Sequence, residues 1–208
     1  MNRVRDATQE DGDETLVSRL WSGDTAAFDE LYRRYSRRLL AYVHRMVRDE
    51  PVSQDLLQEV FLRLLEGEGR YDPQRPLARW LFAVAHNLSC SELRRRQVRR
   101  QSEESATAEA RHVAQALQPP PPGDGLDNER FGRRLAEELS HLDPDRRSAF
   151  LLRHGEGFSI AAISDVLGCP PGTVKSRIFY AARELGERLR PYDPAAGDQA
   201  APDGGPAR

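Results

Sequence analysis

Four residues near the start of one helical segment have side chains suited to binding a nucleic acid. Two hydroxyl groups and two cations lie there within five positions, at Thr173, Lys175, Ser176 and Arg177. Hydroxyls and cations donate hydrogen bonds to phosphate oxygens and to base edges. These residue types therefore favour DNA binding over bond-making chemistry.

Two apolar patterns place these side chains on a helix. In 160–167 and 174–189 the apolar residues recur at intervals of three and four, as in amphipathic helices. Gly168 suits the end of the first helix, and Pro170 and Pro171 suit a turn or the first turn of the second. A helix, a tight turn and a second helix with cations near its start predict a helix-turn-helix, whose second helix enters the major groove. The alternative is two core helices whose charges are solvated.

Composition favours small helical domains. The 208 residues suffice for one large or two small domains, and the 31% of charged and 38% of hydrophobic residues argue against one thick core. Alternating runs typical of strands are nearly absent. We expect an all-α fold of two small helical domains joined by a flexible, proline-rich linker, with the helix-turn-helix in the C-terminal domain.

The net charge of −2 is weak evidence against a nucleic-acid partner, because basic residues are clustered at 94–100 and in the final helix. Cys90 and Cys169 lie far apart and form no CxxC pair, so we expect structural thiols, no metal ligand and no cofactor. No apolar run approaches the roughly 18 residues of a membrane span, and no signal peptide is evident. We expect a cytoplasmic protein without membrane insertion.

Four helices are expected before the linker. The first is short and ends at Ser22 and Gly23; the second is capped by Asp24 or Thr25. The third begins near Pro51, and the fourth runs from about Leu77 to Arg96. The acidic segment 1–13 has no periodicity, and we expect it to be disordered.

The third helix has an acidic face without an evident structural purpose. Its apolar stripe leaves Asp55, Gln58 and Glu59 pointing outward. The two acids are one turn apart and repel each other by a few tenths of a kcal/mol, so an isolated helix gains nothing from them. A basic partner surface would make the pair favourable.

A change of character separates the two halves of the chain. Four consecutive prolines at 119–122 cannot propagate a helix, so 100–128 is predicted to be the linker. The second domain begins near Asp127, with another helix start at Asp143 and Pro144. The segment 191–208 has no core to bury and is expected to be a disordered tail.

Three blocks of sequence resemble bacterial RNA polymerase sigma factors of the sigma-70 family, in the extracytoplasmic-function (ECF) group. Positions 55–61 read DLLQEVF, 79–87 read RWLFAVAHN followed by three arginines at 94–96, and 168–177 read GCPPGTVKSR. The blocks stand in family order, and the resemblance covers most of 15–99 and 129–190. It implies a region 2 domain at 14–99 and a region 4 domain at 129–190.

The resemblance implies partners for these domains. Asp55, Gln58 and Glu59 match the part of region 2 that docks on the β′ clamp helices of core RNA polymerase, and the family also contacts the β flap. Promoter DNA and an anti-sigma factor are the other partners that the resemblance implies.

The helix around Asn87 corresponds to the family's reader of the −10 promoter element. Opening DNA requires a base to leave the stack, and an asparagine amide can donate to and accept from the exposed base edge. Ser91 could assist, and the arginines would hold phosphates. Trp80 and Phe82 either offer stacking faces or complete the core; for Trp80 we favour the core. The candidate −10 residues are Arg79, Trp80, Asn87, Ser91, Arg94, Arg95 and Arg96.

The helix-turn-helix corresponds to the reader of the −35 element. Two departures from the family, Ala161–Ala162 in place of a polar, acidic pair and Tyr180 in place of arginine, put the sequence preference in doubt but not the mode of binding. The candidate −35 residues are Arg153, Thr173, Lys175, Ser176, Arg177, Phe179 and Tyr180.

The leading hypothesis is a subunit that binds core polymerase, recognises the −35 and −10 elements and promotes melting. The alternative is a stand-alone helix-turn-helix regulator, which leaves the acidic helix and Asn87 without a role. We identify no catalytic residue: there is no nucleophile with a base, no phosphate loop and no metal-spaced cluster. An enzyme is the least favoured class.

Overall fold

A computed structural model describes residues 11–67, 71–106 and 126–190 of the chain, and these segments are helical without strands. The first ten positions of the expected disordered N-terminus, most of the expected linker and the expected tail lie outside the described residues. The predicted all-α class is confirmed. None of the described helices is both long and apolar enough to cross a membrane.

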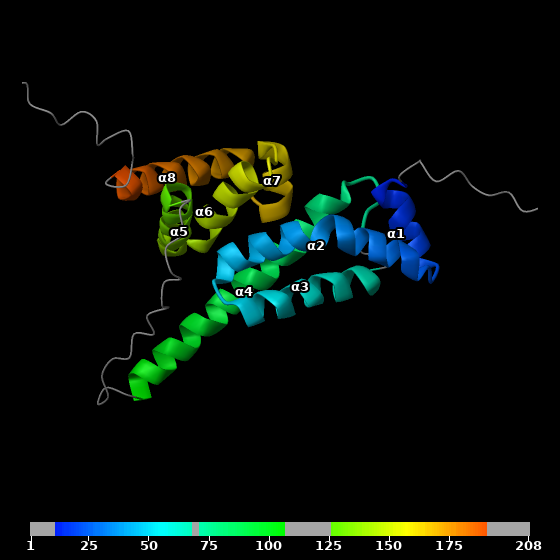
Figure 1. Ribbon diagram of the computed structural model, residues 1–208, viewed down its shortest axis with the longest axis horizontal. Coiled ribbons are helices and arrows are strands. Elements are labelled where there is room, and N and C mark those ends of the chain that lie inside the picture. Colours follow the sequence, from blue (N-terminus) through cyan, green and yellow to red (C-terminus); the bar gives the residue numbers. More distant parts are fainter. Residues whose placement is uncertain (1–10, 68–70, 107–125, 191–208) are drawn as a thin grey trace, which may run out of the picture.

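The first four helices form one bundle, which we call the N-bundle (Figure 1). Its members contact one another mainly through α2, which packs against the other three. They are α1 (Asp13–Trp21), α2 (Thr25–Val47), α3 (Glu50–Leu65) and α4 (Leu77–Ala106).

The helix starts lie where the capping residues predicted them. Asp24 caps α2 by accepting a hydrogen bond from the backbone N–H of Ala26, and Asp49 caps α3 by accepting from Val52. These bonds satisfy N–H groups that have no partner inside the helix. Short polar residues before an apolar period therefore determine where α2 and α3 begin.

The fourth helix is longer than predicted. It continues from Arg96 to Ala106, and its C-terminal half projects away from the other helices (Figure 1). The segment 97–106 holds neither proline nor glycine and is rich in glutamine, glutamate and arginine, which propagate helices well. Helical structure therefore extends into the predicted linker from α4, and also from α5, which begins at Leu126.

The remaining helices form a second bundle, the C-bundle. A single π-helical turn, η1, follows α6 and was not predicted; Glu156 N–H bonds there to the carbonyl of Leu151, five residues back. The elements are α5 (Leu126–His141), α6 (Pro144–Phe150), η1 (Leu151–Gly155), α7 (Ile160–Leu167) and α8 (Pro171–Leu189).

The predicted helix-turn-helix is present as α7 and α8. Ser159 caps α7, and Gly168 ends it in the left-handed region with φ of 60°. Pro171 is the first residue of α8, where its missing N–H costs no hydrogen bond. The helix thus begins two residues before Thr173, the position expected from the sequence.

Gly168→Ala should lower the free energy of unfolding by about 1–2 kcal/mol, because an L side chain is disfavoured in the left-handed region. A Cβ there would meet nothing within 4 Å, so the loss is conformational. Urea unfolding measures it. Gly172→Ala, inside α8 with equally open surroundings, is the matched control and should leave stability unchanged or raise it by up to about 1 kcal/mol. Equal losses in both variants would contradict this interpretation of Gly168.

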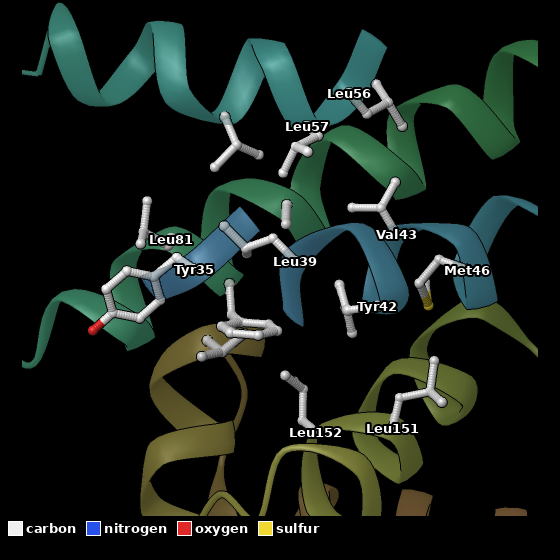
Figure 2. Packing of buried hydrophobic residues seen from close by; sticks show 14 of the residues in the cluster. Tyr35, Leu39, Tyr42, Val43, Met46, Leu56, Leu57, Leu81, Leu151 and Leu152 are labelled. Carbon is white, nitrogen blue, oxygen red and sulfur yellow. The ribbon is translucent and has the colours of Figure 1, made fainter. Parts of the chain in front are cut away.

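One apolar core runs through both bundles. Leu151 and Leu152 reach from η1 toward Tyr42 and Met46 of α2 (Figure 2), and all four are buried. Because α2 lies between α3 and the C-bundle, the outer face of α3 points away from this contact (Figures 1 and 2).

Candidate functional site

The acidic face of α3 is exposed as predicted. Asp55 and Gln58 are solvent-exposed, whereas Glu59 is half-buried and accepts a hydrogen bond from Nε of Arg63 at 2.9 Å. Within the described part of the chain, Asp55 has no cation at ion-pair distance. Asp55 therefore presents an uncompensated negative charge to a partner, whereas the charge of Glu59 is paired with Arg63.

Two leucines that were not predicted from the sequence as site residues continue this face. Leu62 is 50% exposed and Leu65 is 43% exposed. With Asp55 and Gln58 they follow steps of three and four along α3, so the four side chains form one stripe. Exposed apolar residues beside charges are typical of a binding surface. The signal was available in the sequence, because both leucines are out of phase with the buried stripe.

Four of the candidate −10 residues form an exposed row on α4. Asn87, Ser91, Arg94 and Arg95 are all exposed, and Ser91 follows Asn87 by one turn. The amide, the hydroxyl and the two guanidinium groups are thus open to solvent along one helix, and Arg95 also pairs with Glu92 at 3.2 Å. This arrangement can contact a nucleic-acid strand without rearrangement of α4.

The other three candidate −10 residues are engaged within the protein. Arg79 pairs with Asp165 of α7 at 2.9 Å, and Trp80 packs edge-to-face on Tyr71 with ring centroids 6.2 Å apart. Arg96 binds Glu92 at 2.8 Å and Asp49 at 3.0 Å, so it joins α4 to the start of α3. Their assignments to DNA stay predictions, and a structural role is visible for each.

The question of Phe82 is resolved in favour of the core. Its side chain is fully buried and lies edge-to-face against Tyr42 at 5.3 Å and against Phe158 at 5.3 Å. In this arrangement of the bundles it offers no stacking face to a base. The structure therefore favours the core alternative for Phe82.

The reading face of α8 is largely open. Lys175 and Ser176 are exposed, and the aromatic pair Phe179 and Tyr180 is 62% and 49% exposed with ring centroids 5.5 Å apart. The guanidinium of Arg146 lies 5.6 Å from the Tyr180 ring centroid. Large exposed aromatics beside cations suit contacts with bases and phosphates.

The three remaining candidate −35 residues differ in availability. Thr173 is half-buried, and its carbonyl accepts a hydrogen bond from Ser176 at 2.9 Å. Arg153 is exposed and donates to the carbonyl of Phe158 at 3.0 Å. Arg177 is half-buried and pairs with Asp145 of α6, so in this structure its charge is already compensated.

The two bundles meet at a contact that we call the seam, which the sequence did not predict. The Tyr42 hydroxyl lies 2.7 Å from Oγ of Ser148, and Arg147 donates to the carbonyl of Met46. Burial raises the pKa of Tyr42 and lowers that of Arg147. Ion pairs flank these buried contacts: Arg38 with Glu156 at 2.9 Å, and Arg79 with Asp165 at 2.9 Å.

Arg38→Glu should destabilise the closed arrangement of the two bundles, relative to the open one, by about 1–2 kcal/mol. The reason is that the Glu156 side chain is only 8% exposed and would lose its partner. Small-angle scattering would show an increased radius of gyration. Combining it with Glu156→Arg restores the pair and should restore compactness, whereas Arg37→Glu, exposed on the same helix, should have no effect. An unchanged radius in Arg38→Glu would contradict this role for the ion pair.

Comparison with known proteins finds one family match in each of the two bundles. Residues 31–99 match the family Sigma-70 region 2, and residues 132–185 match the family Sigma-70, region 4. The RNA polymerase sigma-H factor of Pseudomonas aeruginosa is 32% identical over 190 residues, covering 88% of this chain and 96% of that protein. The chain belongs to the sigma-70 family. It is an ECF-group sigma factor, as the resemblance predicted.

Other relatives of this chain are also named as RNA polymerase sigma factors. The sigma factor CarQ of Myxococcus xanthus is 32% identical and matches 83% of this chain and 95% of its own length. The ECF sigma-E factor of Escherichia coli is 29% identical over 86% of this chain and 95% of its own length. Sigma factors initiate transcription without catalysing a reaction, so the expectation that the chain is not an enzyme is confirmed by its family.

Solved structures share the fold of this sigma factor. The structure of CnrH in complex with the cytosolic domain of CnrY has a TM-score of 0.63 at 23% identity, covering 87% of this chain and 99% of that one. The sigma factor RpoE of Bartonella quintana, in complex with the anti-sigma factor NepR, has a TM-score of 0.59 at 24% identity, covering 78% and 96%. At these identities the likeness concerns the fold.

Proposed function

We propose that this sigma factor binds core RNA polymerase through the outer face of α3 and directs it to promoters. The carrying observation is the stripe of Asp55, Gln58, Leu62 and Leu65, which is exposed and lies on the side of the N-bundle away from the seam. Acids attract a basic partner and the leucines supply apolar area, so the stripe suits a partner such as the β′ clamp helices. The β flap is the second polymerase contact that we propose.

The exposed row on α4 is the proposed reader of the −10 element. Arg94 and Arg95 would bind phosphates, and Asn87 with Ser91 would bind a base that has left the stack. Unstacking a base costs a few kcal/mol, which hydrogen bonds to the extruded base can offset. The same row can therefore bind DNA and favour its melting.

The exposed face of α8 is the proposed reader of the −35 element. Its N-terminal residues Lys175 and Ser176 would approach base edges in the major groove, with Phe179 and Tyr180 beside them. Arg177 belongs to the residues predicted from the sequence for this role. The ion pair with Asp145 must break before Arg177 can contact DNA.

Promoter binding requires the bundles to separate. The names −35 and −10 give the positions of the two elements relative to the transcription start, so their centres are about 25 base pairs apart. At 3.4 Å per pair this corresponds to roughly 85 Å of duplex. In this structure α4 and α7 are in direct contact, and Arg79 pairs with Asp165 across them. The seam is therefore a closed state that opens before or during binding to polymerase and promoter.

We also propose an anti-sigma factor as a partner and the cytoplasm as the site of action. One of the solved relatives named above is a complex of the sigma factor RpoE with the anti-sigma factor NepR. The domain limits 14–99 and 129–190 and the linker 100–128 stay proposals. They enclose the family matches at 31–99 and 132–185.

The experiment that tests the proposal compares promoter binding by the chain alone and with purified core polymerase. A labelled promoter duplex should be retarded and melted only when both are present. Retardation by the chain alone, unaffected by polymerase, would instead support the stand-alone regulator, which explains α7 and α8 but not the face of α3.

A further inference from the structure

Three potential metal ligands from the two bundles meet at the seam. His86 and Cys90 lie one turn apart on α4, and Asp145 lies in the first turn of α6. One ligand atom from each lies within 4.8 Å of the others. Nε2 of His86 is 3.8 Å from Sγ of Cys90 and 3.9 Å from Oδ1 of Asp145.

These distances are close to those of a tetrahedral zinc site. Bonds of about 2.3 Å to sulfur and about 2.0–2.2 Å to nitrogen and oxygen place the sulfur about 3.6 Å and the oxygen about 3.4 Å from the nitrogen. These two separations exceed the ideal values by roughly half an ångström or less. Sγ of Cys90 also lies 3.7 Å from Nδ1, so the imidazole must turn about its Cβ–Cγ bond to aim Nε2 between the sulfur and the carboxylate.

The hydrogen bond that the buried imidazole makes is long. His86 is 7% exposed, and the Tyr42 hydroxyl oxygen lies 3.5 Å from Nδ1. Buried polar groups normally have partners at shorter distances. A cation between His86 and Asp145 would give Nε2 a partner at bonding distance.

Residues around the three ligands can orient them. With Nε2 on a metal, Nδ1 would donate to the Tyr42 hydroxyl, which lies 2.7 Å from Ser148 Oγ. Oδ2 of Asp145 accepts from Arg177 and leaves Oδ1 facing His86. Outer partners of this kind fix the orientation of metal ligands.

Charge and access also suit a divalent cation. A thiolate and a carboxylate together balance its two charges, and a mixed sulfur, nitrogen and oxygen set suits Zn²⁺. Cysteine binds Zn²⁺ as a thiolate, so binding would release the Cys90 proton to solvent. The Asp145 side chain is 40% exposed, which leaves an entry path and room for water as the fourth ligand.

We propose that His86, Cys90 and Asp145 bind one Zn²⁺ ion, which links the two bundles and stabilises the closed state. Because the ligands come from both sides of the seam, the ion cannot keep all three when the bundles separate. Zinc would thereby slow the association with core polymerase. This last consequence rests on the proposed function, whereas the site itself does not.

The test uses the full-length, metal-free chain titrated with Co²⁺, followed by competition with Zn²⁺. One equivalent should produce tetrahedral d–d bands and a thiolate-to-cobalt charge-transfer band. Cys90→Ser should abolish the charge-transfer band, and Asp145→Asn should weaken binding by more than the roughly 10- to 100-fold typical of losing an outer partner. Cys169→Ser, which removes the only other thiol, is the matched control and should bind like the parent. Circular dichroism verifies that each variant is folded.

Small-angle scattering then tests the link between the bundles. Zinc should shift the parent toward the compact form and leave Asp145→Asn unaffected. Cobalt spectra that stay unchanged in Cys90→Ser would overturn the metal site. An undiminished affinity of Asp145→Asn for Co²⁺ would overturn the proposal that the ion links the two bundles. If the chain binds core polymerase neither with nor without zinc, the proposed function fails. The cobalt spectra still decide whether the metal site exists.

Discussion

Replacing Asp55 and Glu59 together by arginine is expected to abolish binding to core polymerase while both bundles remain folded. The two acids lie on the outer face of α3, and neither belongs to the apolar core. Reversing both charges converts attraction into repulsion against a basic surface, and losing one partner of a buried charge pair alone costs about 2–5 kcal/mol. A loss of affinity of at least about 100-fold should follow. Fluorescence titration of labelled chain with core polymerase measures it.

The control for that variant carries the same change in net charge elsewhere. Glu14→Arg with Asp29→Arg alters two exposed acids on α1 and α2 and should bind core polymerase like the parent. Equal losses in both double variants would attribute the effect to overall charge. Unchanged affinity in Asp55→Arg with Glu59→Arg would refute the docking assignment.

Asn87→Ala is expected to impair promoter melting much more than the initial binding of duplex. The amide is exposed on α4, so its removal costs no packing. A side chain that hydrogen-bonds a base through two atoms contributes roughly 1–3 kcal/mol, which corresponds to a roughly 5- to 150-fold loss of open complex. Permanganate reactivity of unpaired thymines reports melting, and gel retardation under conditions that prevent melting reports the closed complex.

Gln97→Ala supplies the matched comparison for Asn87. It removes an exposed amide of the same chemistry from the same helix, in the part of α4 that projects beyond the bundle. Melting by this variant should remain close to that of the parent. If Asn87→Ala weakens duplex association as much as it weakens melting, the base-capture role is wrong.

Local features of the sequence predicted most of the helices. The carboxylates of Asp24, Asp49 and Asp143 precede the helices that they cap, and Gly168 ends α7 with positive φ. Each of these signals acts over a few residues and can be identified in the sequence alone. The exposed side chains of α3 and α8 were predictable for the same reason, because the apolar period determines which face is buried.

Contacts between distant segments could not be derived in this way. Arg177 fits a DNA-reading position on α8 by spacing, yet it pairs with Asp145, 32 residues earlier in the chain. His86 and Cys90 have the i, i+4 spacing of two ligands on one helix, but nothing in the sequence places Asp145 beside them. The seam depends on how two bundles pack, and a single sequence does not encode that packing as a local pattern.

The most direct measurement of the central claim is transcription by purified core polymerase on genomic DNA with and without the chain, followed by mapping of the RNA start sites. We expect new start sites that depend on the chain and that share two upstream sequence elements at a constant spacing, one for each bundle. Start sites unchanged by the chain, under conditions where it binds the same DNA alone, would contradict the assignment of both readers.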